Sequence, residues 1–391
     1  MTQAPPAAPT GRPIDVIEVS GRLDPVVAEF VSRTIRRAES SGGEVVVIQL
    51  DSPGSLLGGR ALDALTREVA RSEVPVAVWI GPSGSVALGD AARLVDAAAA
   101  AGMAPGTSVD DPAGAGGRSR PPALGPKSAM ARGVVDLDSP TLGDFVVGLD
   151  GRQSGDRVLQ TARALGRGQR TAAGNVRFAK LDLVEQVLHA AANPQVAYLL
   201  LLVGLLLVVF EFFTAGVGVA GGVGAAALVL AAFGLDVLPT TPLGLGLLLV
   251  GVVGFAIDVQ AGAPRAWSVI GALCLLAGSL RLYGDGVSLP LLTILLVAGG
   301  YGVAMVSGMT SMLRARFATP TIGRESMVGQ MGVARSAVDP DGTVTLGGAV
   351  WRARTNRATP ISSGDPIRVV RIDGVLLEVE PEEGGARDAG H

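Results

Sequence analysis

Long apolar runs dominate the middle of the chain. Between Val196 and Thr310 only six residues carry a formal charge, and these fall near the ends of five runs. The runs are Gln195–Phe213, Ala215–Leu235, Pro242–Ile257, Ala266–Leu282 and Ser288–Met309. Each is close to the ~17–25 residues that a helix needs to cross the hydrocarbon core of a bilayer. The pattern predicts four or five transmembrane helices within residues 195–310 and excludes a purely soluble enzyme.

Before this block, short apolar strands alternate with amphipathic helices. The strands are predicted at Val16–Val19, Val45–Leu50 and Val76–Ile80. Asp24-Pro25, a helix-capping aspartate followed by proline, is expected to open the first intervening helix. Strands that are apolar throughout indicate a parallel sheet covered on both faces. We therefore expect an α/β domain over residues 14–150.

The flanking segments differ in composition. Residues 1–13 and the tail 382–391 are expected to be disordered. Residues 151–194 are expected to form a β-poor connector and then an interfacial helix, or alternatively an ordinary core-facing helix. The apolar face of that helix consists of Leu183, Val184, Val187 and Leu188. Residues 319–381 contain five short β runs separated by turns, which predicts a small all-β barrel of the OB type. No sequence repeat suggests an internally duplicated fold.

Composition narrows the chemistry. The formal net charge of −3 predicts no surface for nucleic acid. Cys274, the one cysteine, excludes a disulfide framework and a thiol metal cluster. No spacing groups the carboxylates of the α/β segment into a metal site, so no metal and no cofactor are predicted. The expected partners are membrane lipids and other membrane proteins, and homo-oligomerisation stays open.

Arginines set the expected orientation. Arg265 lies between the third and fourth runs, and Arg314, Arg316 and Arg324 follow the fifth. The loops after the first two runs carry no basic residue. The positive-inside rule therefore predicts a cell-membrane protein with a cytoplasmic barrel and an extracytoplasmic α/β domain. Residues 1–13 show no secretory signal, so the route of export is left open.

Several motifs resemble those of the NfeD (nodulation efficiency) family in its long form. In the α/β segment they are Leu50–Gly54, Met103–Ser108 and Gly133–Asp136. In the membrane segment they are Glu211, Gly216, Gly218, Gly221 and Gly224, which are similar to the family's first hairpin. In the barrel they include Gly332, Pro340, Gly342, Trp351 and Gly374. The resemblance implies a multidomain protein with a ClpP/crotonase-like α/β domain, an α-helical transmembrane bundle and an NfeD-type OB barrel. It also implies a stomatin- or flotillin-like membrane partner.

The family's α/β domain is a serine protease that uses a Ser–Lys dyad, and this sequence departs from it. An ungapped alignment places Gly89 at the nucleophile position, and the oxyanion-side glycine pair becomes Gly54-Ser55. A serine hydroxyl needs a neighbouring base, and Lys127 is the only lysine of the α/β segment. The dyad that can still be built is Ser85 with Lys127. The alternative interpretation is a turn serine and a solvated lysine, which leaves a degenerate domain.

Three functions follow from these observations. The favoured hypothesis is an NfeD-type scaffold that assists a stomatin- or flotillin-like protein in membrane organisation or quality control. Trp351, Arg352 and Arg354 are its predicted partner-binding residues. The first alternative is an active membrane-bound serine endopeptidase that uses the dyad. The second is a small-solute transporter that uses Glu211, although the favoured interpretation of this side chain is that it caps a tight hairpin.

Overall fold

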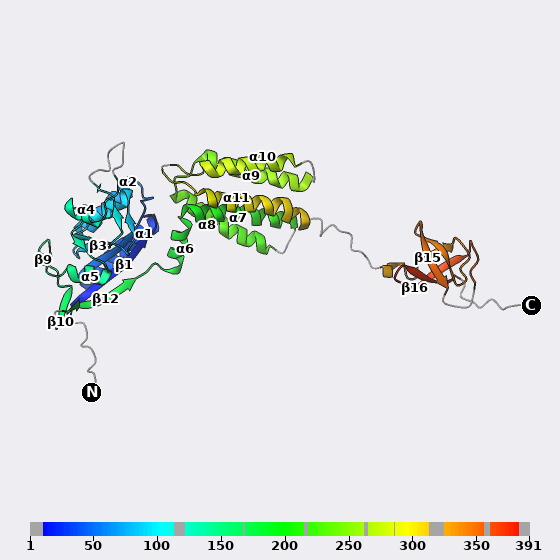
Figure 1. Cartoon of the computed structure of the whole chain (residues 1–391), viewed down its shortest axis with the longest axis horizontal. Helices are drawn as coiled ribbons and strands as arrows, with labels where there is room; N and C mark the ends of the chain where they lie inside the picture. The colour runs from blue at the N-terminus through cyan, green and yellow to red at the C-terminus, as the bar shows by residue number, and fades with distance from the viewer. Residues whose placement is uncertain are drawn as a thin grey trace, which may run out of the picture. The chain divides into compact units, whose positions relative to one another are not determined.

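A computed structural model describes residues 11–112, 122–166, 169–214, 218–261, 265–284, 286–312, 324–355 and 360–382. The chain divides into two compact units, Met1–Thr310 and Ser311–His391. The first unit contains an α/β domain and a set of apolar helices, and the second contains a β-barrel (Figure 1). Residues 1–10 and 383–391, for which disorder was predicted, lie outside the described residues. Gly11–Pro13, predicted to be disordered, belong instead to the first strand.

The α/β domain is built on a six-stranded parallel sheet with the order β12-β1-β2-β3-β5-β7. The strands are β1 (Gly11–Ser20), β2 (Val45–Asp51), β3 (Val76–Ile80), β5 (Ala100–Met103), β7 (Leu137–Asp138) and β12 (Gly174–Ala179). Alternate side chains enter two separate cores. On one face Val46, Ile48 and Leu50 of β2 pack with the helices α1 (Pro25–Ser41), α2 (Gly59–Arg71) and α3 (Arg93–Ala97). On the other face Val45 and Val47 pack with α5 (Leu142–Gly148).

The first helix begins as predicted. Asp24 is its N-cap, and the Asp24 Oδ1 oxygen accepts a hydrogen bond from the Val27 backbone N–H at 2.8 Å. Pro25 follows at the first helical position, where a missing N–H has no cost. The helix ends at Gly42, whose φ of 66° is the left-handed conformation that glycine adopts readily.

Shorter elements complete the domain. They are β4 (Val86–Ala87), η1 (Gly89–Ala92), β6 (Ser108–Val109), α4 (Pro126–Ala131), β8 (Gln153–Ser154), β9 (Arg157–Val158), β10 (Ala162–Gly166) and β11 (Gln169–Ala172). The prediction of a β-poor connector was wrong. Strand β12 extends the main sheet beside β1, and Arg177 forms a two-bond ion pair with Asp15. Edge strands and exposed hairpins tolerate polar residues, which explains why the hydrophobic pattern of this segment did not predict strands.

Helix α6 (Leu183–Ala191) links the α/β domain to the membrane helices. It begins with a capping box, in which Asp182 and Glu185 each accept the other's backbone N–H. Its apolar residues Leu183, Val184 and Val187 are 79%, 68% and 48% exposed. They do not face the core of the domain, which supports the predicted interfacial helix.

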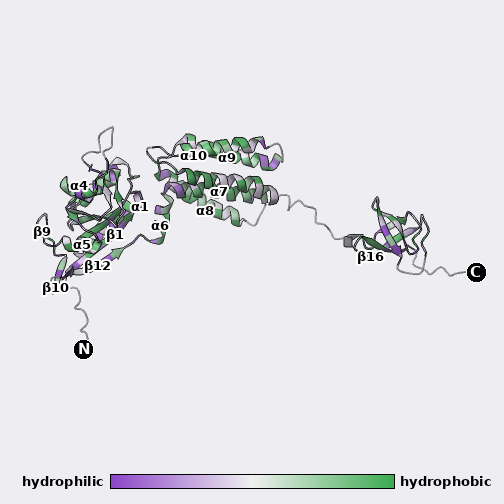
Figure 2. Ribbon diagram, viewed as in Figure 1, coloured by the Kyte–Doolittle hydropathy of each residue, from purple (hydrophilic) through white to green (hydrophobic). Residues whose placement is uncertain are grey.

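Five apolar helices follow, and Figure 2 shows them coloured as hydrophobic over most of their length. They are α7 (Pro194–Thr214), α8 (Val219–Val237), α9 (Pro242–Ala261), α10 (Ala266–Arg281) and α11 (Leu291–Val303). A π-helical segment, Ala304–Met309, continues α11. Four of the helices are long and apolar enough to cross a membrane, and α10 is shorter at 16 residues.

The helix pairs α7–α8 and α9–α10 are two copies of one hairpin, spaced 47 residues apart (Gly204 to Gly251). In the first copy a Cβ on Gly204 would lie 2.9 Å from Leu228 Cγ and 3.0 Å from the Gly224 carbonyl oxygen. In the second, a Cβ on Gly251 would lie 2.8 Å from Leu275 Cγ and 2.9 Å from the Gly271 oxygen. The segments Leu200–Gly204 and Leu247–Gly251 are also identical in sequence. The structure therefore shows a correspondence between the two hairpins that the sequence analysis did not predict.

The second unit is a closed barrel with the strand order β13-β14-β15-β17-β16. Its strands are β13 (Met331–Ala334), β14 (Asp341–Leu346), β15 (Ala349–Thr355), β16 (Pro366–Asp373) and β17 (Leu376–Pro381), after a short turn of helix at Arg324–Met327. Val344, Ile367 and Leu377 are fully buried in its core. Five strands closed into a small barrel fit the predicted OB architecture.

Candidate functional site

Ser85 lies in the turn between β3 and β4 and is 4% exposed. Its backbone N–H donates to the Pro82 carbonyl at 3.0 Å, and its carbonyl accepts from the Ser108 N–H at 3.2 Å. Both main-chain groups are therefore used to hold the turn. A nucleophile has to meet its substrate, and this side chain is nearly closed off from solvent.

Lys127 is an exposed residue of the short helix α4, not a loop residue as the alternative interpretation assumed. It lines a cavity of about 370 Å³ together with Pro105, Gly106 and Asp138. Ser85 is not among the described residues that line this cavity. Ser83 does not line it either, but Ser83 Oγ contacts two residues that do: it donates to the Pro105 carbonyl and lies 3.0 Å from where a Gly106 Cβ would be. Sequence comparison did not single out Ser83.

Gly89 starts the helical turn η1 with a φ of 55°. Its backbone N–H donates to Asp110 Oδ2 at 2.6 Å. A residue with a side chain adopts this left-handed conformation at a cost of roughly 1–2 kcal/mol. The local backbone at the expected nucleophile position therefore suits glycine and disfavours serine.

The Gly54-Ser55 turn is fixed by its own hydrogen bonds. Ser52 Oγ donates to the Gly54 carbonyl at 2.8 Å and lies 3.4 Å from the Gly54 nitrogen. Leu23 N–H donates to the Gly54 carbonyl at 3.0 Å, which ties the turn to the start of α1. An oxyanion hole needs N–H groups that point at a developing charge, and the Gly54 N–H points back at Ser52.

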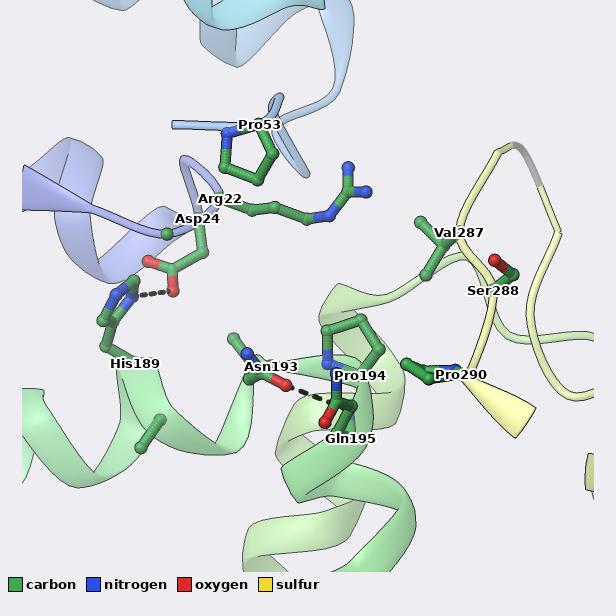
Figure 3. Close-up of a pocket in the computed structure, with 13 residues that line it drawn as sticks. Arg22, Asp24, Pro53, His189, Asn193, Pro194, Gln195, Val287, Ser288 and Pro290 are labelled. Carbon is green, nitrogen blue, oxygen red and sulfur yellow. Dashed lines mark hydrogen bonds and ion pairs between the residues drawn. The ribbon is translucent and has the colours of Figure 1, made fainter. Parts of the chain in front are cut away.

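A histidine–aspartate pair joins α6 to the α/β domain (Figure 3). His189 Nδ1 lies 2.6 Å from Asp24 Oδ2, and His189 Nε2 lies 3.0 Å from the Ser20 carbonyl oxygen. Asp24 is fully buried. Its hydrogen bond raises the pKa of His189, and partial burial of the ring opposes this effect. Sequence analysis predicted Asp24 as a helix cap but gave no sign of its second partner.

Beside this pair lies a cavity of about 290 Å³. Figure 3 shows Arg22 and Pro53 of the α/β domain on one side and Asn193 and Gln195, at the start of α7, on the other. Asn193 Oδ1 accepts the Gln195 N–H at 3.0 Å. The α/β domain and the membrane helices thus meet around a small polar cavity.

Two carboxylates occupy matching positions in the duplicated hairpins. Glu211 accepts the backbone N–H groups of Gly218 at 2.8 Å and Gly221 at 3.2 Å, at the start of α8. Asp258, 47 residues further on, accepts the Ser268 N–H at 2.6 Å at the start of α10. Anions at helix N-termini are stabilised by the orphan N–H groups there. The 47-residue spacing between equivalent positions is the sequence signal that relates Asp258 to Glu211.

The glycines of the predicted first hairpin have different environments. Gly224 is buried against Gly204, and a Cβ on it would lie 2.9 Å from the Gly204 carbonyl oxygen. Gly218 precedes α8 with a φ of 87°. A Cβ on Gly221 would lie 3.0 Å from Glu211 Cγ. Gly216 lies outside the described residues.

In the barrel, Arg352 and Arg354 are exposed on β15. Arg354 forms a two-bond ion pair with Asp341, with distances of 2.8 and 3.1 Å. This contact lowers the pKa of Asp341. Trp351 packs against the barrel core, so it does not share the outward face of the two arginines.

These features define an integral membrane protein with an α/β domain before its helical bundle and a small barrel after it. Residues 195–319 match the family model for the NfeD integral membrane domain, and residues 324–381 match that for the NfeD-like C-terminal, partner-binding domain. The chain therefore belongs to the NfeD family, in its long form.

Known relatives extend over nearly the whole chain. The membrane-bound protease PH1510 of Pyrococcus horikoshii is 24% identical over 95% of this chain and 94% of its own length. The membrane protein NfeD1b of Bacillus subtilis is 22% identical over 93% and 92%. A solved structure, described as 1510-N membrane protease specific for a stomatin homolog from Pyrococcus horikoshii, is 18% identical with a TM-score of 0.38, over 46% of this chain and 98% of its own. The two family models confirm the predicted family, and the structure confirms the predicted order of an α/β domain, a set of apolar helices and a small barrel.

Proposed function

We propose that this protein is a membrane scaffold that binds a stomatin- or flotillin-like membrane protein, and that its α/β domain does not hydrolyse peptides. The observation that carries the proposal is the different surroundings of the two predicted dyad residues. Ser85 is nearly buried in a turn, whereas Lys127 is exposed at a cavity that Ser85 does not line. A general base has to lie within about 2.6–3.2 Å of the hydroxyl that it deprotonates.

The choice of partner rests on two findings. The model matched by the barrel describes a partner-binding domain. The 1510-N structure is described as specific for a stomatin homolog. We propose that the barrel of this chain holds a stomatin-like partner through Arg352 and Arg354, which present guanidinium groups on one strand.

Proteolysis is the alternative with a specific observation behind it. PH1510, which is similar along nearly the whole chain, is described as a membrane-bound protease. In this chain Ser83 is exposed in the same turn as Ser85, and its hydroxyl donates to the carbonyl of Pro105, a residue that lines the Lys127 cavity. If the domain were active, Ser83 would be as strong a candidate nucleophile as Ser85.

A fluorophosphonate probe applied to the full-length protein in detergent separates these functions. We expect no labelling of Ser83 or Ser85, together with recovery of a co-expressed stomatin-like protein by affinity purification. Labelling that disappears in Ser85→Ala or Ser83→Ala, and also in Lys127→Ala, would establish a peptidase instead. Thr66→Ala, which changes a hydroxyl on α2 away from this turn, is the control for nonspecific labelling.

Solute transport receives less support. Both carboxylate oxygens of Glu211 accept backbone N–H groups at the start of α8. This arrangement supports a capping role, since an ion-conducting carboxylate would need an oxygen directed at its ion. Solute flux in liposomes that is abolished by Glu211→Gln would reverse this conclusion.

We also propose that the barrel is cytoplasmic and the α/β domain extracytoplasmic. The duplication supports this topology, because α10 is the counterpart of α8 and so completes a second hairpin despite its length. Five crossings place the two ends of the bundle on opposite sides. Alkylation of single cysteines introduced at Arg71 and Arg371 in sealed cells would test it, since only one of the two should react with an impermeant reagent.

A further inference from the structure

A groove of about 620 Å³ runs along the membrane bundle between α10 and α11. Its walls are Val269, Leu273 and Leu276 of α10 and Leu295, Gly299 and Val303 of α11. Phe255 of α9 forms part of its floor. In the five-crossing topology proposed above, both walls belong to helices that cross the bilayer, so the groove is open to hydrocarbon and not to water.

The polar residues of this groove are gathered at one end. Arg265 and Ser268 lie at the start of α10, and Ser307 lies in the π-helical segment after α11. The consecutive helices α10 and α11 are joined by a short connection, so they run in opposite directions and bring these residues to the same end. From Arg265 to Leu276 the groove extends about 17 Å at 1.5 Å per residue. One leaflet of the ~30 Å hydrocarbon core has about the same depth.

The charge at the polar end is free to bind an anion. Arg265 is exposed and forms no ion pair within the part of the chain that the structure describes. Asp258 is directed elsewhere, since it is buried and caps the start of α10 through the Ser268 N–H. A guanidinium group binds phosphate oxygens through two parallel hydrogen bonds.

We propose that this groove binds a single anionic phospholipid, with one acyl chain along α10 and α11 and the phosphate at Arg265. The apolar walls exclude a polar ligand, and the length of the groove fits one acyl chain within one leaflet. The first hairpin lacks the cationic end of this site, because the position equivalent to Arg265 is Gly218. The duplicated membrane domain therefore has one specific lipid site in its second half.

The chain offers a matched pair of variants that test the groove. A Cβ on either Gly299 or Gly300 would meet no atom within 4 Å, so both helical positions accept a larger side chain. Only Gly299 lines the groove. Gly299→Leu is therefore expected to fill it, and Gly300→Leu is the control that leaves it open.

The experiment uses the full-length protein in phosphatidylcholine nanodiscs that contain a photoactivatable phosphatidylglycerol. We expect crosslinks to α10 and α11 that Gly299→Leu abolishes and Gly300→Leu retains. Arg265→Gln should reduce the preference for phosphatidylglycerol over phosphatidylcholine about fivefold, the effect of one basic residue near a membrane surface. Arg281→Gln, at the other end of α10, should leave the preference unchanged. Thermal unfolding of each variant shows that it is folded.

Three outcomes would contradict the proposal. Wild-type crosslinking in Gly299→Leu would show that the lipid binds elsewhere. Loss of self-association in Gly299→Leu, with lipid retention unchanged, would show that a helix of a second copy fills the groove. An intact groove with equal binding of both lipids in the wild-type protein would remove the assigned role of Arg265.

Discussion

The two membrane hairpins have the same interior and different exteriors. Between their helices, the glycine pairs Gly204–Gly224 and Gly251–Gly271 place two backbones in contact, with equivalent distances that agree to about 0.1 Å. Outside, α8 presents Gly222, Ala225 and Ala226, whereas the equivalent residues of α10 are Val269, Ala272 and Leu273. The helix–helix contact within each hairpin does not accommodate residues larger than glycine, since a Cβ there would meet backbone atoms.

The capping carboxylates show the same contrast in detail. Both oxygens of Glu211 accept backbone N–H groups. In Asp258 one oxygen accepts the Ser268 N–H, while Oδ1 is buried without a hydrogen-bond partner among the described residues. One copy is thus fully satisfied and the other carries an unpaired polar atom inside the bundle. The two hairpins therefore differ in hydrogen bonding at an equivalent position.

The largest loss of stability is expected when a glycine between paired helices is replaced by a larger residue. Gly224→Leu and Gly271→Leu should each destabilise the protein by ~3 kcal/mol, because the new side chain meets the carbonyl oxygen of the facing helix. Gly222→Leu and Gly246→Leu are matched controls, since a Cβ there meets no atom within 4 Å. Thermal unfolding of the detergent-solubilised variants measures the difference. Tolerance of Leu at only one of the two buried positions would break the equivalence of the hairpins.

The next largest loss of stability should differ between the two capping carboxylates, Glu211 and Asp258. Glu211→Gln should cost ~1–3 kcal/mol, because the amide NH₂ would face a backbone N–H donor and leave it unsatisfied. Asp258→Asn should cost less than ~1 kcal/mol, because the amide oxygen can still accept the Ser268 N–H and the NH₂ replaces an oxygen without a partner. The same unfolding measurement applies. Equal losses of unfolding free energy would show that the two carboxylates contribute equally to stability.

The sequence predicted elements better than it predicted contacts. Asp24 was recognised as a helix cap from its place before Pro25, since capping is a local property of the chain. Its pairing with His189 joins residues 165 positions apart, and no local pattern reports such a contact. Strand β12 was missed because it lies at a sheet edge, where polar residues are tolerated.

Within the candidate site, composition pointed to Ser85 and Lys127, but the burial of Ser85 and the exposure of Lys127 depend on how the turn after β3 and the helix α4 fold. The sequence likewise could not reveal that the Ser83 hydroxyl contacts Pro105, which lines the Lys127 cavity. The two hairpins are identical in sequence at Leu200–Gly204 and Leu247–Gly251, but elsewhere their outward-facing residues differ, which lowers the sequence similarity between them. What was predictable from sequence is local, and what was missed is tertiary.

The first hairpin differs from the second because it is attached to α6. The contact that holds α6 to the α/β domain should depend on pH. His189 has a raised pKa in the folded state, so the Asp24–His189 contact contributes fully below the unfolded pKa of about 6.5 and is lost as pH rises through the folded value. As pH rises, hydrogen exchange in α6 should therefore accelerate by more than the intrinsic exchange rate does. Exchange in α10 is the internal reference. In His189→Gln this extra dependence should disappear. An unchanged profile in that variant would assign the opening of α6 to another group.

The smallest effect on stability is expected in the barrel, which lies outside the duplicated part. Arg352→Ala and Arg354→Ala should leave thermal unfolding unchanged, because both side chains are exposed and the Arg354–Asp341 pair is screened by water. Binding of a stomatin-like partner should nevertheless weaken several-fold in pull-down titrations, since each variant removes a guanidinium from the proposed contact strand. Arg368→Ala and Arg371→Ala on β16 are matched exposed controls. Equal weakening by all four variants would indicate a diffuse electrostatic attraction and would remove the assignment of β15 as the partner surface.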